Sequence, residues 1–103
     1  MIWTLTARRL KAGTYEAFRE AWDPSRGNAA ALAGWREIYH CHDVADPDVV
    51  LSFGLFEGSL ADLREAQSRL GRSDQVDRID PFVEAVLLDG AYEVVEQLTP
   101  NSL

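Results

Sequence analysis

The chain of 103 residues has a single cysteine, Cys41, which excludes an internal disulfide. Small domains of oxidising compartments commonly depend on disulfides, and this chain has no such framework. It also lacks an apolar run long enough to span a bilayer. Its first residues show no charged segment followed by an apolar stretch, as a signal peptide would. These absences predict a cytoplasmic protein with no membrane partner.

Basic residues are also scarce. Ten lysines and arginines stand against 17 acidic residues, which gives a formal net charge of −7. Nucleic acids and anionic membrane surfaces attract proteins through a basic footprint. The densest basic cluster, at residues 8–11, is too small to reverse this balance. The composition therefore argues against a nucleic acid as a partner.

What is present is the composition of one small globular domain, with 47% hydrophobic and 26% charged residues. We expect this domain to cover residues 1–98 and to be followed by a short tail at 99–103. A domain of this size buries only about two-thirds of the surface that its unfolded chain exposes. Association with a second copy is therefore an expected source of further burial.

The order of secondary structure follows from apolar periodicity, β-branched content and capping residues. The expected elements are a strand at 1–9, a helix at 14–22, a loop at 25–28, short helical turns at 29–33, strands at 35–44 and 49–56, a helix between Ser59 and Gly71, helical segments within 73–88, and a last strand at 91–98. The order is β-α-β-β-α-β, the ferredoxin-like α+β pattern with one four-stranded antiparallel sheet.

Local signals support the second half of this order. Ser59 and Asp62 have the spacing of a capping box at the start of a helix. Asp80 and Pro81 suit the N-cap and the first position of a further helical segment, which we expect to continue to residue 88. The pair at 89–90, Asp-Gly, is then expected to turn the chain into the last strand.

The strand expected at 49–56 has two unlike faces. One face carries small residues, and the other carries bulky apolar residues. The bulky residues of this strand and of the first strand are expected to share one sheet face, made of Trp3, Leu5, Val49, Leu51, Phe53 and Leu55. Such a face is too apolar to remain in water. Because the helices cover one face of the sheet, we expect a second copy of the chain to cover the other.

Two histidines, His40 and His42, alternate with Tyr39 and Cys41 on the strand expected at 35–44. Alternate residues share a face of a strand, so the two imidazoles point the same way. Three interpretations stay open: structural histidines at a rim, a general base or ligand-binding residue in a pocket, and metal ligands that need a third partner. Cys41 is expected to be a buried, unreactive thiol on the opposite face. A one-residue shift of register would exchange the two faces.

The segments LKAGTYEAF at 10–18, GWR at 34–36, DP at 46–47 and FEGSL at 56–60 resemble the antibiotic-biosynthesis-monooxygenase superfamily. In element order the resemblance covers nearly the whole chain, and its motifs are mostly turns and caps. It implies a dimeric α/β barrel in which two ferredoxin-like units pack sheet to sheet. It also implies a small-molecule pocket between the sheet and the helices of each subunit.

Known members of that superfamily include cofactor-independent monooxygenases of polycyclic phenols and haem-degrading oxygenases. The haem degraders use an Asn on the first strand, a Trp at the end of the third and a His on the following helix. Here Thr6 and Phe56 stand at the first two positions, and the helix around residues 65–67 has no His. The resemblance therefore does not extend to haem degradation, and we expect no cofactor.

The implied pocket lies on the small face of the strand at 49–56. Its candidate substrate-binding residues are Thr4, Thr6, Ser52, Gly54 and, as a wall, Phe56. A competing interpretation is that Ser52 and Gly54 only make room for a packed helix.

Three residues are candidates for catalysis in this pocket. Arg8 is the candidate cation for a carboxylate, a phenolate or a developing enolate, and His40 or His42 is the candidate base. If Arg8 is instead in solvent, it has no such role. The first function class is oxidation or another proton-transfer reaction of a phenol or carbon acid, with the substrate supplying the electrons. The second is a non-catalytic ligand-binding or dimerisation module, and metal binding comes third.

Overall fold

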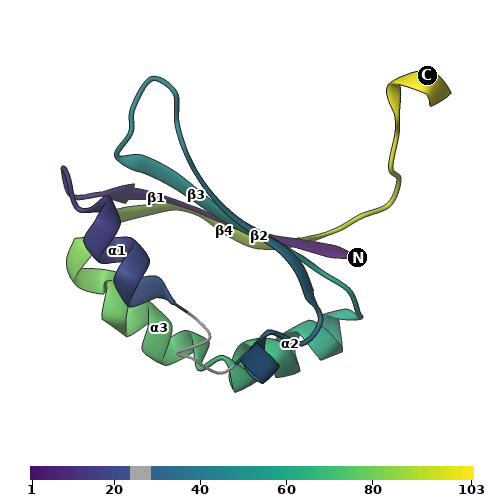
Figure 1. Ribbon diagram of the computed structural model, residues 1–103, viewed down its shortest axis with the longest axis horizontal. Coiled ribbons are helices and arrows are strands. Elements are labelled where there is room, and N and C mark those ends of the chain that lie inside the picture. The colour runs from purple at the N-terminus through teal and green to yellow at the C-terminus, as the bar shows by residue number, and fades with distance from the viewer. Residues whose placement is uncertain (24–28) are drawn as a thin grey trace.

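A four-stranded antiparallel sheet carries helices on one face only, as a computed structural model shows for residues 1–23 and 29–103 (Figure 1). The elements are β1 (Ile2–Leu10), α1 (Tyr15–Trp22), η1 (Ala29–Leu32), β2 (Trp35–His42), β3 (Val49–Phe56), α2 (Leu60–Arg69), α3 (Arg72–Ile79), η2 (Asp80–Phe82), β4 (Val83–Glu93) and η3 (Pro100–Ser102). The strand order is β2-β3-β1-β4. This confirms the ferredoxin-like α+β class. The loop expected at 25–28 lies outside the described residues.

The local signals around α2 act as predicted. The Ser59 hydroxyl accepts a hydrogen bond from the Asp62 backbone N–H at 3.1 Å, and the Asp62 carboxylate accepts one from the Ser59 N–H at 3.0 Å. These two bonds satisfy donors that the helix itself leaves free. Gly71 adopts a φ of +64°, which ends α2 and lets α3 start in a new direction. Among the described helices, none is both long and apolar enough to cross a membrane.

A last strand follows the helices as predicted, but its bounds are 83–93 rather than 91–98, and the helix expected up to residue 88 and the turn at 89–90 are wrong. Pro81 begins only a single 3₁₀ turn, and residues 83–93 form one long strand with no turn at Asp89. Because β1 has β3 on one side, its other edge is free to pair, and β4 pairs along nearly all of it, with irregularities between Ala7 and Arg8 and between Arg9 and Leu10. Pairing with a neighbouring strand overrides a local helix signal. After β4 the chain leaves the sheet, and η3 lies apart from it (Figure 1).

Two clusters of buried apolar side chains lie between the sheet and the helices. One contains Ile2, Phe56, Leu63 and Ala66, and the other contains Leu10, Phe18, Val50 and Ile79. Each cluster uses one end of β1 and one end of β3. The middle of both strands carries buried polar residues on the same face, namely Thr6, Arg8 and Ser52. Burying polar groups costs stability unless they are paired. This polar stretch is therefore the candidate position of a ligand-binding site.

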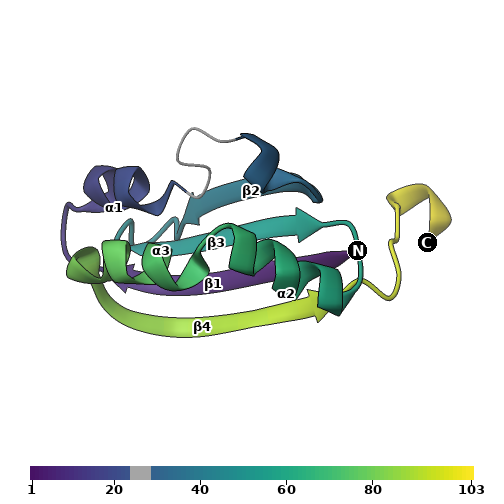
Figure 2. The same ribbon diagram turned by 90° about the horizontal axis from the view of Figure 1, so that it is seen from below.

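The other face of the sheet is covered by no helix of the described chain (Figures 1 and 2). Phe53 on β3 lies 5.6 Å from Trp3 on β1 and stacks at 5.1 Å on Tyr39 of β2, measured between ring centroids. Cys41 pairs with Leu51 on this face and is exposed, so the expectation of a buried thiol is not met in the single chain. The face is therefore apolar and only half-buried.

Candidate functional site

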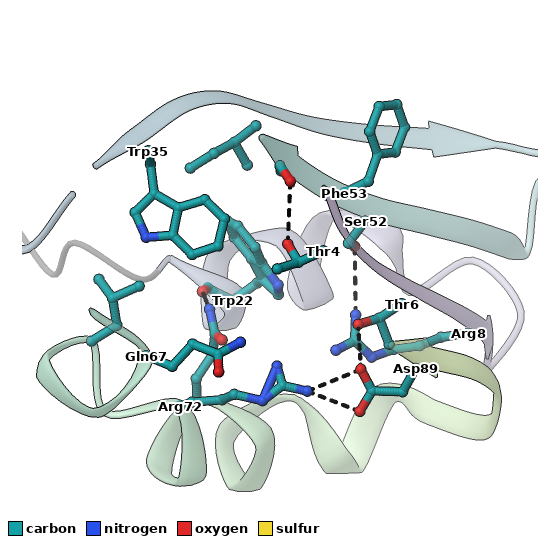
Figure 3. A pocket seen from close by; sticks show the side chains of 14 residues that line it. Thr4, Thr6, Arg8, Trp22, Trp35, Ser52, Phe53, Gln67, Arg72 and Asp89 are labelled. Atoms are coloured by element: carbon teal, nitrogen blue, oxygen red, sulfur yellow. Dashed lines mark hydrogen bonds and ion pairs between the residues drawn. The ribbon is translucent and has the colours of Figure 1, made fainter. Parts of the chain in front are cut away.

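A cavity of about 80 Å³ lies between the two apolar clusters, enclosed by the sheet and by residues of α1, α2 and α3 (Figure 3). Its lining consists of Thr4, Thr6, Arg8, Trp22, Trp35, Ile38, Ser52, Phe53, Gly54, Gln67, Leu70, Arg72, Gln75 and Asp89. The volume is room for several water molecules. It therefore suits a small ligand of about one ring.

One wall of the cavity is apolar. Trp22, Trp35, Ile38 and Leu70 supply it. Trp22 is held at its backbone, because its carbonyl accepts a hydrogen bond from the Gln75 side chain. Aromatic walls of this kind bind flat apolar groups well.

The opposite wall is polar and charged. The Asp89 carboxylate on β4 accepts two hydrogen bonds from the Arg72 guanidinium, at 2.9 and 3.1 Å, and one from the Thr6 hydroxyl at 3.2 Å. Burial alone would raise the pKa of Asp89, but the bonds and charge of Arg72, with Thr6 and Arg8, outweigh it and lower the pKa. Asp89 is therefore an ionised, fully engaged acceptor.

Arg8 is the most unusual residue of this wall. Its side chain is only 6% exposed, yet its one hydrogen bond to a described residue is a long one, 3.5 Å to the Ser52 hydroxyl. Its guanidinium also lies 5.6 Å from the centroid of the Phe18 ring. No carboxylate of the described residues lies within ion-pair distance of it. Burial, and then the nearby charge of Arg72, lower the pKa of Arg8, but a guanidinium stays charged at physiological pH.

His40 contacts Ser52 but is not itself among the residues that line the cavity. Its Nδ1 is 2.7 Å from the Ser52 hydroxyl oxygen, and its ring meets Trp22 edge to face at 4.4 Å between centroids. Its Nε2 is buried with no hydrogen-bond partner among the described residues. Burial, followed by the charges of Arg19 and Arg8, lowers the pKa of His40 to about 4. The imidazole is thus neutral at physiological pH.

No protein-family model and no curated protein matches the chain in sequence. Solved structures do match. A Deinococcus radiodurans protein described as a "putative antibiotic biosynthesis monooxygenase" has a TM-score of 0.74 at 16% identity, covering 96% of this chain and 97% of that one. Proteins so described from Nitrosomonas europaea and Chloroflexus aurantiacus have TM-scores of 0.72 and 0.70 at 14% and 16% identity, covering 93% and 96% of this chain and 100% and 98% of theirs.

This chain has the fold of those proteins. At such low identity the likeness extends to the fold alone, because one fold carries many functions. The shared fold places the helices over one face of the sheet, which is where the cavity lies. What the cavity does must be argued from its own residues.

The fold brings five of the eight candidate residues to this cavity: Thr4, Thr6, Arg8, Ser52 and Gly54. Phe56 is not among the lining residues and instead packs in the first apolar cluster, 5.2 Å from Trp35 between ring centroids. His40 reaches the cavity only through Ser52. His42 is exposed at the end of β2. No group of three or more potential metal ligands occurs among the described residues.

Sequence reasoning misses the two tryptophans, Arg72 and Asp89. Asp89 is missed because the sequence predicts a turn at residues 89–90. The structure has a strand there, which places Asp89 opposite Thr6. The helical spacing of Trp22 assigns it to the core, and nothing in the local pattern separates a core aromatic from one that lines a cavity. Arg72 follows the bend at Gly71 between α2 and α3, where a charged residue carries no local signal.

Gly54 sets the size of the cavity. A methyl group at this position would lie 2.8 Å from the benzo ring of Trp35, closer than side chains tolerate. Gly54→Ala is therefore expected to displace Trp35, to destabilise the fold by about 1–3 kcal/mol and to weaken ligand binding. Thermal unfolding and a ligand titration measure the two effects. Unchanged binding in a folded variant would show that Trp35 does not shape the site.

Proposed function

We propose that the cavity binds a small aromatic or acidic-carbon molecule as an anion and that the protein oxidises it with dioxygen, without an organic cofactor or metal. The observation that carries this proposal is Arg8, a buried cation without an ion-pair partner among the described residues, facing the cavity. A buried charge without a counter-ion is costly. A ligand that supplies the missing negative charge would offset this cost, which gives the protein a reason to keep the buried cation.

In this reaction the substrate supplies the electrons. A phenol loses its proton, the resulting anion reduces dioxygen, and one oxygen atom forms a new C–O bond. The other oxygen atom leaves as water with two hydrogens taken from the substrate, so a phenol and dioxygen give a quinone and water. The protein contributes a cavity, an aromatic wall that orients the ring, and a cation that favours the anionic form.

A second candidate function is ligand binding without chemistry. It is favoured by the shortage of a general base: Asp89 is engaged by three hydrogen bonds, and His40 is a weak base that lies behind Ser52. In the enzymatic case the proton is released to solvent, helped by the cation, or passes through Ser52 to His40. In the binding case the ligand stays unchanged.

We further propose that the protein is a homodimer joined through the open sheet face. Supporting residues are the aromatic cluster of Trp3, Tyr39 and Phe53 and the half-exposed leucines beside it. A contiguous apolar face of this kind is typical of a protein interface. It is continuous across β1, β2 and β3 and has no cover within the described chain.

The proposed reaction is tested by oxygen uptake. We expect the protein to consume dioxygen with phenol or 3-methylphenol, and Arg8→Gln to lower kcat/KM roughly a hundredfold, as loss of one charge-stabilising donor does. Arg69→Gln, which changes an exposed arginine paired with Glu65 on α2, is the matched control. Binding of these phenols without oxygen uptake would favour the binding module, and neither binding nor uptake would overturn both candidates.

A further inference from the structure

The charge of the cavity is opposite in sign to that of the whole chain. Its lining contains two guanidinium groups, from Arg8 and Arg72, and one carboxylate, from Asp89. The other lining residues are uncharged, so the site has one unbalanced positive charge inside a protein of net charge −7. A cavity of low polarity strengthens the field of that charge. One negative charge on a ligand would therefore balance the site.

The unbalanced charge can be assigned to one residue. Arg72 is paired with Asp89, because its Nη2 donates hydrogen bonds to both carboxylate oxygens. Arg8 has five N–H donors, and only one of them makes a hydrogen bond to a described residue. Its remaining donors have no partner among residues 1–23 and 29–103, which leaves them available to a ligand. Figure 3 shows Arg8 at the end of the cavity next to Asp89, with Trp35 at the opposite end.

We propose that the ligand is a small aromatic monocarboxylate, bound through its carboxylate to Arg8 with its ring against the tryptophan wall. This inference rests on the proposed binding role of the cavity and names the anionic group. A carboxylate matches the planar fork of a guanidinium, because two parallel N–H donors can meet its two oxygens. It is ionised at neutral pH, whereas a phenol with a pKa near 10 must first lose a proton.

The same geometry orients the ligand. With the carboxylate at Arg8, the far edge of a single ring points toward Trp35, between the aromatic wall and the polar face of the sheet. A dianion such as phosphate would leave one negative charge unbalanced beside Asp89. The hydroxyl or acidic carbon that is oxidised would then lie at the Trp35 end, away from Arg8. For a carboxylate ligand Arg8 accordingly acts on binding more than on the chemical step, whereas for a simple phenol, which has no carboxylate, Arg8 holds the phenolate itself.

Benzoate and benzamide test this proposal, because they differ in charge and hardly in shape. We expect benzoate to quench the tryptophan fluorescence, or to give a calorimetric isotherm, with at least tenfold higher affinity than benzamide. Arg8→Gln should remove this preference and leave benzamide binding almost unchanged, while Arg69→Gln should leave both unchanged. Arg8→Lys, which keeps the charge but loses the fork, should retain only part of the preference.

The outcomes separate this proposal from the proposed function. If benzamide binds as tightly as benzoate, or if Arg8→Gln weakens both equally, the carboxylate assignment is overturned, while oxidation of phenols by the same protein would leave the proposed function intact. If neither these ligands nor phenols bind, both the carboxylate assignment and the proposed function are overturned. Should Arg8→Gln fail to fold, the comparison of the two ligands on the unaltered protein still decides. A further readout is KM: for a hydroxybenzoate, Arg8→Gln should raise KM far more than it lowers kcat.

Discussion

Between pH 6.5 and pH 4 the protein is expected to lose about 2 kcal/mol of stability through His40 alone, and His40→Asn should remove this loss. His40 has its pKa lowered to about 4 in the fold, from 6.5 in the unfolded chain. Below pH 6.5 the unfolded chain therefore takes up a proton that the folded chain refuses until about pH 4. The free energy of unfolding therefore falls as the pH falls from 6.5 to about 4. Below pH 4 His40 causes no further change in stability.

The magnitude follows from the same values. A pKa difference of this size corresponds to about 3 kcal/mol, and we reduce it to about 2 because the ring is not fully buried. Asn places an amide near the position of Nδ1, so it can still bond to Ser52. Urea unfolding at several pH values, at one protein concentration, gives the comparison.

The only other histidine provides the control for this prediction. His42 lies on the same strand, two residues away, and is exposed. His42→Asn should therefore keep the acid sensitivity of the parent. Equal slopes of stability against pH for the parent and His40→Asn would contradict the environment described for His40.

Phe53→Glu is expected to convert the proposed dimer into a folded monomer. Phe53 is the centre of the aromatic cluster on the open face, where it contacts Trp3 and Tyr39. A carboxylate at this point would be desolvated on association, which we expect to weaken the dimer at least a hundredfold, or about 3 kcal/mol. Light scattering during gel filtration, at several loading concentrations, measures the mass.

The fold itself should survive this change, because Phe53 is only partly buried in the single chain and belongs to neither apolar cluster. Leu60→Glu is the matched control: Leu60 is 54% exposed on α2, away from the sheet face. It should leave the mass unchanged. A parent protein that is monomeric at tens of micromolar, or a dimeric Phe53→Glu, would place the open face outside any dimer interface.

Strand alternation makes much of the site predictable. Because every second residue of a strand shares a face, the sequence alone groups Thr4, Thr6 and Arg8 on one strand, and Ser52 and Gly54 on another. Pairing of β1 with β3 then brings Thr6 opposite Ser52 and Thr4 opposite Gly54. The sequence interpretation therefore identifies the sheet side of the cavity.

The helix side is not predictable in the same way. Arg72 and Trp22 reach the cavity because of how α3 and α1 dock on the sheet, which depends on packing across the whole chain. Asp89 requires the identity of β4, and that strand is decided by the free edge of β1 rather than by its own residues. The depressed pKa of His40 likewise arises from neighbours that are distant in sequence, including Arg19 and Arg8.

The division of β1 and β3 into apolar ends and a polar middle has an evolutionary consequence. Apart from Trp22 and Trp35, which pack against the apolar clusters and also line the cavity, the residues that hold sheet and helices together, such as Ile2, Leu10 and Val50, differ from those that line it. A lineage can therefore exchange Thr4, Thr6 or Ser52, and so retarget the pocket, while the scaffold keeps its anchoring contacts. Divergent sequences can in this way retain one architecture while their ligands drift apart.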